Sequence, residues 1–445
     1  MLEFLFDRFS PYIKFSPGSL KFQTIQVFIA RVGALSLALL CNLALTRWLG
    51  ISIYGEYTYI LAWVTILSIP GVGMGTLVTR ETAIACRQED DEKLGGLIRW
   101  SISSTLLIGG ALTLAGIVAV SLSARYASKT LPLAPVIGLA VIPLMYLQTN
   151  ISALFRGCRR VELSVFLSET VSMAFMVAWA AGCFFLGAQA SAAMALVGRL
   201  VTVCAIVLLF VIMLPRLKLP WHSNAAARDQ ISSWRKSRAS LTLLKGISIT
   251  EGHLPVLILG FALGPKPVAL FSLASRIANM VILALSIVVM TTGPRLAELH
   301  ANKEYRPMQR LMTRSTIAVS AWAIPIALGL VIAGRWLLSW FGAEFVTGYP
   351  ILVVLVIGQM VNAITGTVGV VMTMGGLEKV VLRTQTYGLT ITAVLCLALI
   401  PIWGGIGAAI GSTIALIFWN IALTVQLYRR LGIASSFYSP FISGK

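Results

Sequence analysis

The sequence contains an internal repeat with a shift of 214 residues. Within the stretch TRWLGISIYGEY at 46–57, the motif Leu49-Gly50-x3-Tyr54-Gly55-x-Tyr57 is matched by Leu263-Gly264-x3-Val268-Ala269-x-Phe271. At nearly the same shift, three further pairs coincide: Arg80 with Arg295, Arg99 with Arg314, and Pro135 with Pro350. The register therefore holds over more than eighty residues and predicts two copies of one folding unit.

Each copy is a series of long apolar stretches. The chain is 58% hydrophobic and 11% charged, with a mean hydropathy of +0.88, which lies outside the range of soluble domains. A transmembrane helix needs about 20 apolar residues. Twelve stretches qualify: 23–45, 57–79, 98–121, 130–154, 164–186, 190–214, 241–263, 268–292, 315–338, 349–374, 384–403 and 405–428. We therefore expect an all-α polytopic membrane protein with twelve transmembrane helices.

The number of helices per copy predicts how the copies are related. Six is an even number, so both copies start on the same side of the membrane and form two parallel six-helix lobes around a central cavity. The expected N-terminal lobe is 1–215 and the C-terminal lobe is 241–445. The stretch 216–240 between them contains six basic residues and is expected to be a cytoplasmic linker that also attracts anionic membrane lipids.

The positive charges are distributed unevenly. The chain has 35 Lys and Arg against 16 Asp and Glu, and 26 of the 35 cations fall in segments on the side of the N-terminus, whereas five fall in the opposite loops. The positive-inside rule then places both termini in the cytoplasm and explains the net charge without a nucleic-acid partner. No cleavable signal peptide is expected. Residues 1–15 fit either an interfacial helix or a disordered tail.

The chain lacks the residue patterns of catalysis. It has only three histidines, and its six cysteines are scattered singly. No nucleophile elbow, phosphate-binding loop, paired carboxylates, disulfide framework or metal-ligand spacing is present. We expect no enzyme activity, no cofactor and no metal site.

Basic residues inside the spans are the first candidates for function, because an ionisable group at membrane depth is costly and usually faces a polar interior. Arg31 lies ten residues beyond Lys21, about 15 Å along a helix, and shares a helix face with Asn42. The repeat places Lys245 at the position equivalent to Arg31, so we expect both side chains to face one cavity. In the alternative interpretation, Lys245 snorkels to the inner surface of the membrane. The four cations within spans are Arg31, Arg199, Lys245 and Arg276.

Polar stripes accompany these cations. Ser272, Arg276 and Asn279 recur at spacings of four and three, and Thr202 follows Arg199 by nearly one turn. A further stripe, Gln359, Asn362, Gly366 and Thr373, fits either a cavity wall or hydrogen bonding between helices.

The acidic residues within spans are Glu169 and Glu251, so basic residues outnumber them and predict a cationic cavity. Pro255 cannot donate a hydrogen bond to the carbonyl of Glu251 and predicts a kink that can act as a hinge. Glu251, His253 and Glu169 are candidates for proton coupling. A plain ion pair between Glu251 and one of the arginines is the other interpretation.

Three motifs resemble a known family. The stretch ALTRWLGISIYGEYTYILA at 44–62, the Arg-Gly pair at 156–157 and the Gly-Gly pair at 375–376 are similar to those of Wzx-type O-antigen and polysaccharide flippases. These form the polysaccharide transporter branch of the multidrug/oligosaccharidyl-lipid/polysaccharide exporter superfamily.

The resemblance implies a function. A flippase of this type moves a polyprenyl-diphosphate-linked oligosaccharide, such as an O-antigen unit of lipopolysaccharide biosynthesis, from the inner to the outer leaflet of the cell inner membrane by alternating access. Its expected partners are this lipid-linked oligosaccharide, membrane lipids, and a polysaccharide polymerase with other assembly proteins. We expect Arg31, Lys245, Arg276, Arg199, Asn42 and Asn279 to bind the diphosphate headgroup.

Two other functions fit parts of the sequence. Multidrug antiporters of the same superfamily share the architecture, but they transport cationic drugs and would present carboxylates to them. A non-transporting scaffold for polysaccharide assembly would gain nothing from four basic residues within spans. Lipid II flippases are similar but have two extra helices.

Overall fold

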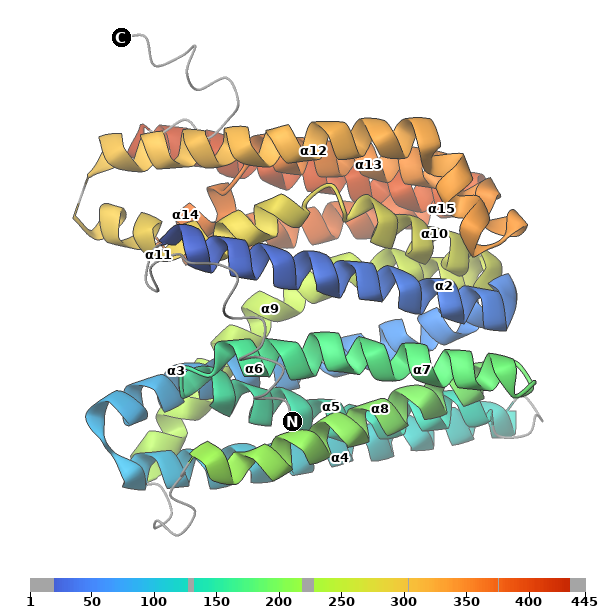
Figure 1. The fold of residues 1–445 in the computed structure, drawn as a ribbon, viewed down its shortest axis with the longest axis horizontal. Helices are drawn as coiled ribbons and strands as arrows, with labels where there is room; N and C mark the ends of the chain where they lie inside the picture. Colours follow the sequence, from blue (N-terminus) through green and yellow to red (C-terminus); the bar gives the residue numbers. More distant parts are fainter. Residues whose placement is uncertain (1–19, 127–131, 218–227, 303, 375, 433–445) are drawn as a thin grey trace.

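Helices account for nearly all of the described chain, and no strand is found in it (Figure 1). The computed structural model describes residues 20–126, 132–217, 228–302, 304–374 and 376–432. The predicted interfacial segment 1–15 and residues 218–227 of the predicted linker lie outside these ranges. The all-α fold is confirmed.

The described part of the first half contains seven α-helices, one π-helical segment and one short 3-10 helix. Their bounds are α2 Leu20–Leu67, α3 Ile69–Gln88, α4 Asp91–Tyr126, α5 Leu133–Gly157, α6 Val161–Val165, η2 Phe166–Val171, α7 Ser172–Phe185, α8 Ala192–Met213 and η3 Leu214–Leu217.

The described part of the second half begins at Arg228. Its elements are α9 Arg228–Leu263, α10 Pro265–Ala278, α11 Leu283–Ala301, α12 Tyr305–Phe341, η4 Ala343–Gly348, α13 Tyr349–Thr365, α14 Val368–Met374 and α15 Glu378–Leu431.

Three glycines turn the chain at one end of the molecule, which we call the glycine end. Gly50 inside α2 has φ 70° and ψ 173°, and Gly264 between α9 and α10 has φ 83° and ψ −166°. These two glycines are equivalent in the sequence repeat, so the repeat is visible in the backbone conformation. Gly404 inside α15 also has a positive φ, of 54°. Side chains with a Cβ rarely adopt such angles, which explains glycine at all three positions.

The described helices include many that can cross a membrane. Within the described residues, nine helices are long and apolar enough to cross a membrane, and the bent pair α10 and α11 brings the number to ten. Both α2 and α15 contain one glycine whose backbone angles are not helical, so each consists of two helical parts. If the two parts of each are counted separately, the number of spans is consistent with the predicted twelve.

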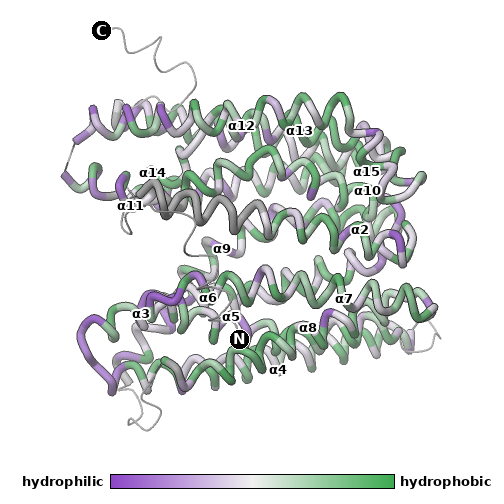
Figure 2. The backbone as a smooth tube through the Cα atoms, in the orientation of Figure 1, coloured by the Kyte–Doolittle hydropathy of each residue, from purple (hydrophilic) through white to green (hydrophobic). Residues whose placement is uncertain are grey.

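The outer surface is apolar, as a lipid-facing surface must be. Large side chains such as Leu107, Ile332 and Leu208 are 73%, 82% and 60% exposed. Apolar residues dominate along α4, α8 and α12, whereas polar residues gather at the turn between α3 and α4 (Figure 2). This pattern is typical of a protein whose sides contact the lipid of a membrane.

The helices form two bundles, with α9 running from one to the other (Figure 1). The part of α2 after Gly50 packs on α5, where Ile60 lies against Gly138. We call this part of α2 together with α3 to α8 the first bundle, and α10 to α15 the second bundle. The first part of α9 lies on the first bundle, where Trp234 packs on Trp100 at 5.4 Å between ring centroids. Its later part reaches the second bundle, where Glu251 lies next to Gly388 of α15.

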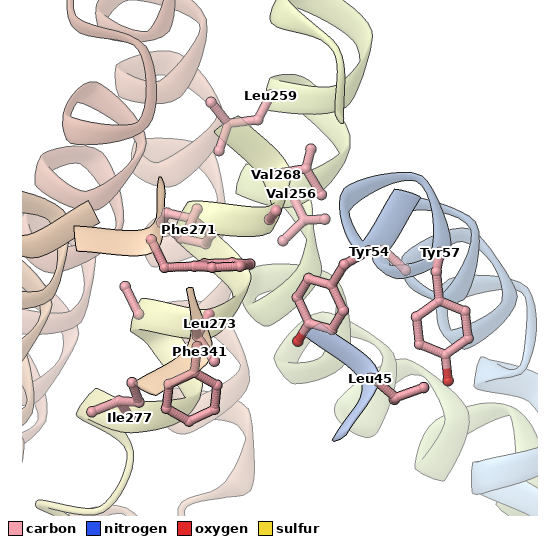
Figure 3. Close-up of a cluster of buried hydrophobic side chains, with 14 of the residues drawn as sticks. Leu45, Tyr54, Tyr57, Val256, Leu259, Val268, Phe271, Leu273, Ile277 and Phe341 are labelled. Atoms are coloured by element: carbon pink, nitrogen blue, oxygen red, sulfur yellow. The ribbon is translucent and has the colours of Figure 1, made fainter. Parts of the chain in front are cut away.

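The two bundles meet near the glycine end. A Cβ on Gly55 of α2 would lie 1.9 Å from the carbonyl oxygen of Pro265, so the backbones of α2 and α10 are in direct contact there. Arg47 donates a hydrogen bond to the carbonyl of Trp340 at 2.7 Å. Figure 3 shows Tyr54 and Tyr57 of α2 beside Val256 and Val268, and all four belong to one buried cluster. The glycine end is therefore closed in this conformation.

Candidate functional site

A cavity of about 620 Å³ lies between the two bundles. Its wall is formed by the part of α2 after Gly50 and by α5, α8, α9, α10, α13 and α15. Polar groups are concentrated on it: Thr58, Thr65, Arg199, Ser248, Glu251, His253, Ser272, Ser275, Arg276, Asn279, Gln359, Gln385, Thr392, Ser412 and Thr413. Most of these residues lie within apolar spans, so they mark the faces that line a polar interior.

Arg276 is held in this cavity by residues of α2. Its Nη1 donates a hydrogen bond to Oδ1 of Asn42 at 2.6 Å, and the hydroxyl of Tyr54 donates to the same oxygen at 2.9 Å. Asn42 is buried at 3% exposure and in turn donates to the carbonyl of Ala38 at 2.6 Å. Because one guanidinium carries five N–H donors, Arg276 keeps donors for an anion after bonding to Asn42.

The stripe predicted on the helix of Arg276 lies along the cavity. Ser272, Arg276 and Asn279 are all lining residues on α10. The amide of Asn279 accepts a hydrogen bond from Nε2 of Gln359 at 3.1 Å, and Asn362 donates to Oε1 of Gln359 at 3.3 Å. Gln359 thus both lines the cavity and bonds from α13 to α10. The other members of its predicted stripe, Asn362, Gly366 and Thr373, are not part of the cavity wall.

Arg199 faces the cavity from the first bundle. Its Nη1 lies 3.4 Å from Oγ of Ser172 on α7, a long hydrogen bond. Thr202, predicted on the same face, is buried and does not line the cavity. Arg199 and Arg276 therefore approach one space from different bundles.

Only one carboxylate, that of Glu251, lines the cavity in the described chain. No ion pair of Glu251 is found among the described residues, so the predicted pairing with an arginine is not present in this conformation. His253 and Pro255 follow it on α9 and also line the cavity. The charge balance of two guanidinium groups against one carboxylate favours an anionic ligand.

Two predicted residues lie outside the cavity wall, and a third has no described side chain. The third is Arg31, which belongs to α2. Lys245 is exposed on α9 and is not part of the cavity wall. Glu169 lies in the π turn η2, where its charge acts on Arg156 of α5. The proposed roles of these three residues stay predictions.

Several cavity residues were not predicted from the sequence. Trp419 and Gln385 of α15 and Ser248 of α9 line the wall, and Tyr54 supports Asn42. Tyr54 belongs to the repeat motif, and the sequence therefore marked its position as structurally important. No sequence pattern marked Trp419, because a tryptophan in an apolar span fits the lipid interface or the protein core equally well.

The described residues contain no group of three or more His, Cys, Asp or Glu side chains that would hold a metal ion. Two helical bundles that enclose a polar, mainly cationic cavity and present apolar flanks define a membrane transporter. Comparison with known proteins agrees with this class and narrows it.

The chain belongs to the polysaccharide biosynthesis protein family, whose model matches residues 23–300. It is 25% identical over 196 residues to a protein described as "Probable flippase AglR" from Haloferax volcanii. That match covers 43% of this chain and 41% of the relative, so it spans less than half of either protein.

The fold is similar to that of solved transporters. An inward-facing multidrug resistance MATE family transporter of the MOP superfamily superposes with a TM-score of 0.74 at 13% identity, over 91% of this chain and 98% of that one. The outward-facing form gives 0.69 at 14% identity, over 94% and 97%. A MOP superfamily transporter from Pyrococcus furiosus, described as having a binding pocket of reverse polarity, gives 0.70 at 14% identity, over 93% and 96%. These neighbours confirm the predicted fold, and the family match confirms the predicted family. Together with the flippase relative, they point to a transporter rather than an enzyme.

Proposed function

We propose that this protein is a flippase that moves a polyprenyl-diphosphate-linked oligosaccharide from the inner to the outer leaflet of the cytoplasmic membrane. The family supports a role in polysaccharide biosynthesis, and the relative described as a probable flippase supports lipid translocation. The diphosphate occupies the cavity between the bundles, while the polyprenyl tail stays in the bilayer.

The observation that carries this proposal is the convergence of Arg199 and Arg276 on one cavity from two different bundles. A diphosphate presents several anionic oxygens, and guanidinium groups bind such oxygens through charge-assisted hydrogen bonds. For a unit charge about 6 Å from one guanidinium at an effective dielectric near 20, Coulomb's law gives roughly 3 kcal/mol. Losing one arginine should thus weaken binding by a factor on the order of a hundred.

Alternating access follows from the arrangement of the helices. We assign 1–215 and 241–445 to two lobes with both termini in the cytoplasm, so that the glycine end faces outward. Direct contacts such as Gly55 against Pro265 close that end, and the conformation is then inward-facing. Moving the lobes about α9 and its Pro255 would open the outer side.

What drives the cycle stays a prediction. Glu251 and His253 line the cavity and are the first candidates for proton coupling, with Glu169 as a third. A polysaccharide polymerase and other assembly proteins are the expected partners of the exported unit.

The proposal is tested by surface polysaccharide in a strain that lacks the chromosomal gene. We expect Arg276→Glu and Arg199→Glu, present at normal membrane levels, to abolish polysaccharide display. Arg306 is exposed in the first turn of α12, away from the cavity, so Arg306→Glu serves as the matched charge-reversal control. Normal polysaccharide in both cavity variants would rule out the anion-binding site.

A drug antiporter is the second candidate, because the MATE fold is shared and Glu251 has no cationic partner in the described chain. In that case Glu251→Gln would abolish efflux of organic cations, and Arg276→Glu would leave efflux intact or raise it. The two arginines on the cavity wall favour the flippase.

A further inference from the structure

The wall of the cavity on the second bundle contains an aromatic ring next to a carboxylate. Both flank Gly388 of α15: Oε1 of Glu251 lies 3.4 Å, and Cβ and Cδ1 of Trp419 lie 3.7 Å, from the point where a Cβ on Gly388 would stand. Glu251 and Trp419 line the cavity, and so does Gln385, one helical turn before Gly388. Gly388 itself is buried, and its lack of a side chain lets Glu251 and Trp419 pack closely against α15. The ring, the carboxylate and the amide of Gln385 thus share one part of the cavity wall.

The hydrogen-bonding capacity of these groups is largely unused. Among the described residues, no acceptor is found for the indole N–H of Trp419 and no donor for the carboxylate of Glu251. Gln385 accepts one long hydrogen bond from Ser248, at 3.5 Å. Polar groups that line a cavity without protein partners are the groups available to a ligand.

We infer that Trp419, Glu251 and Gln385 form a saccharide subsite that holds the first sugar of the lipid-linked oligosaccharide. The C–H face of a sugar ring packs on the indole plane, and its hydroxyls donate to the carboxylate and pair with the amide. This inference rests on the proposed function and adds a second site to it, separate from the cations that bind the diphosphate.

The position of the subsite fits the chemistry of a glycosyl diphosphate. Trp419 is 15 residues beyond Gly404 and Arg276 is 12 residues beyond Gly264, so at 1.5 Å per residue they lie about 22 and about 18 Å from the glycine end. They are within one helical turn of the same depth. The first sugar is bonded directly to the diphosphate and must bind beside it, as this arrangement provides.

The test compares two lipids that differ only in the sugar. Purified protein in nanodiscs is titrated with the lipid-linked oligosaccharide extracted from the source cells and with bare polyprenyl diphosphate of the same chain length, and binding is followed by native mass spectrometry. We expect Trp419→Ala to weaken binding of the glycosylated lipid roughly ten-fold and to leave the bare lipid unchanged. Arg276→Ala should weaken both.

Two further variants separate the aromatic ring from its position on the wall. Trp419→Phe keeps an aromatic plane and should retain most of the preference for the glycosylated lipid. The side chain of Gly388→Leu would displace Trp419 and Glu251, which already lie 3.4–3.7 Å from an added Cβ, and should remove that preference. Gly182→Leu, where no atom lies within 4 Å of an added Cβ, is the matched control and should have no effect on the preference.

The outcomes distinguish the two levels of the proposal. Equal loss for both lipids in Trp419→Ala, or no loss for either, would overturn the saccharide subsite and leave the flippase intact. Binding of the organic cation tetraphenylphosphonium that depends on Glu251 and Trp419 would overturn it in favour of a cation site. If the unmodified protein binds neither lipid, the proposed function fails and the subsite fails with it.

Discussion

The guanidinium of Arg276 on α10 lies 2.6 Å from Oδ1 of Asn42 on α2, and this hydrogen bond joins two residues that are 234 positions apart in the sequence. The bond holds the cation at the cavity wall, about 18 Å from the glycine end. The side chain that we propose to bind the diphosphate thus also links α10 to α2.

Asn42→Leu removes the shared acceptor of Arg276 and Tyr54. Leaving buried donors without an acceptor costs about 1–3 kcal/mol, so we expect a lower melting temperature in detergent. Asn42→Asp keeps an oxygen at the same position and should restore stability. A melting temperature for Asn42→Leu equal to that of the unmodified protein would show that this bond contributes little.

Gly55→Ala tests the contact that closes the glycine end. Its Cβ would collide with the carbonyl oxygen of Pro265 at 1.9 Å, so α2 and α10 must separate. We expect a single cysteine placed on the cavity wall to become accessible to a membrane-impermeant maleimide from the outer side. Gly110→Ala in α4, with no atom within 4 Å, is the control and should behave like the unmodified protein. Unchanged labelling in Gly55→Ala would contradict a closed end held by this contact.

Glu81 lies beyond the predicted span 57–79 and makes ion pairs with Lys93 at 3.1 Å and Arg80 at 2.9 Å. Burial alone would raise the pKa of its carboxyl, but hydrogen bonds from Lys93 and Arg80 outweigh that effect and hold the pKa below its ordinary 4.5. The stabilisation is therefore fully present above pH 4.5 and is lost as the pH falls through the lowered pKa.

The pH dependence of Glu81→Gln tests this account. The variant should be less stable than the unmodified protein at pH 7, by about 1 kcal/mol or less because Arg80 is half exposed. The difference should shrink as the pH falls below 4.5. A stability difference that stays constant from pH 7 to pH 3 would mean that Glu81 acts through packing rather than through its charge.

Pro255 lies inside α9 and lines the cavity. Pro255→Ala restores the missing backbone donor and should straighten and stiffen the helix. We expect slower transport with unchanged membrane levels, measured with single-cysteine accessibility from both sides. Full transport with unchanged accessibility would remove the hinge from the account.

The sequence predicted those features that depend on the chain alone. Apolar length predicted membrane spans, and the repeat aligned Gly50 with Gly264, which have similar backbone angles in the structure. Spacing on a single helix placed Arg276 and Asn279 on one face, and both line the cavity.

Features that depend on packing between helices were harder to predict. The burial of Asn42 and its hydrogen bond to Arg276 could not be read from spacing on one helix, and its predicted role in binding the ligand stays a prediction. Lys245 was paired with Arg31 by repeat symmetry; it is exposed on α9 and is not part of the cavity wall, and this pairing also stays a prediction. Trp419 could not be assigned at all, since only tertiary packing decides which face of α15 meets the cavity.

The most direct test of the central claim is translocation in vesicles that contain only the purified protein. Fluorescently labelled lipid-linked oligosaccharide is incorporated, and the fraction exposed on the outer leaflet is measured over time by a quencher that does not cross the membrane. We predict rapid exchange for the unmodified protein and for Arg306→Glu, and exchange at the rate of empty vesicles for Arg276→Glu and Arg199→Glu. Exchange at the unmodified rate in both cavity variants, or no exchange above empty vesicles in the unmodified protein, would contradict the account.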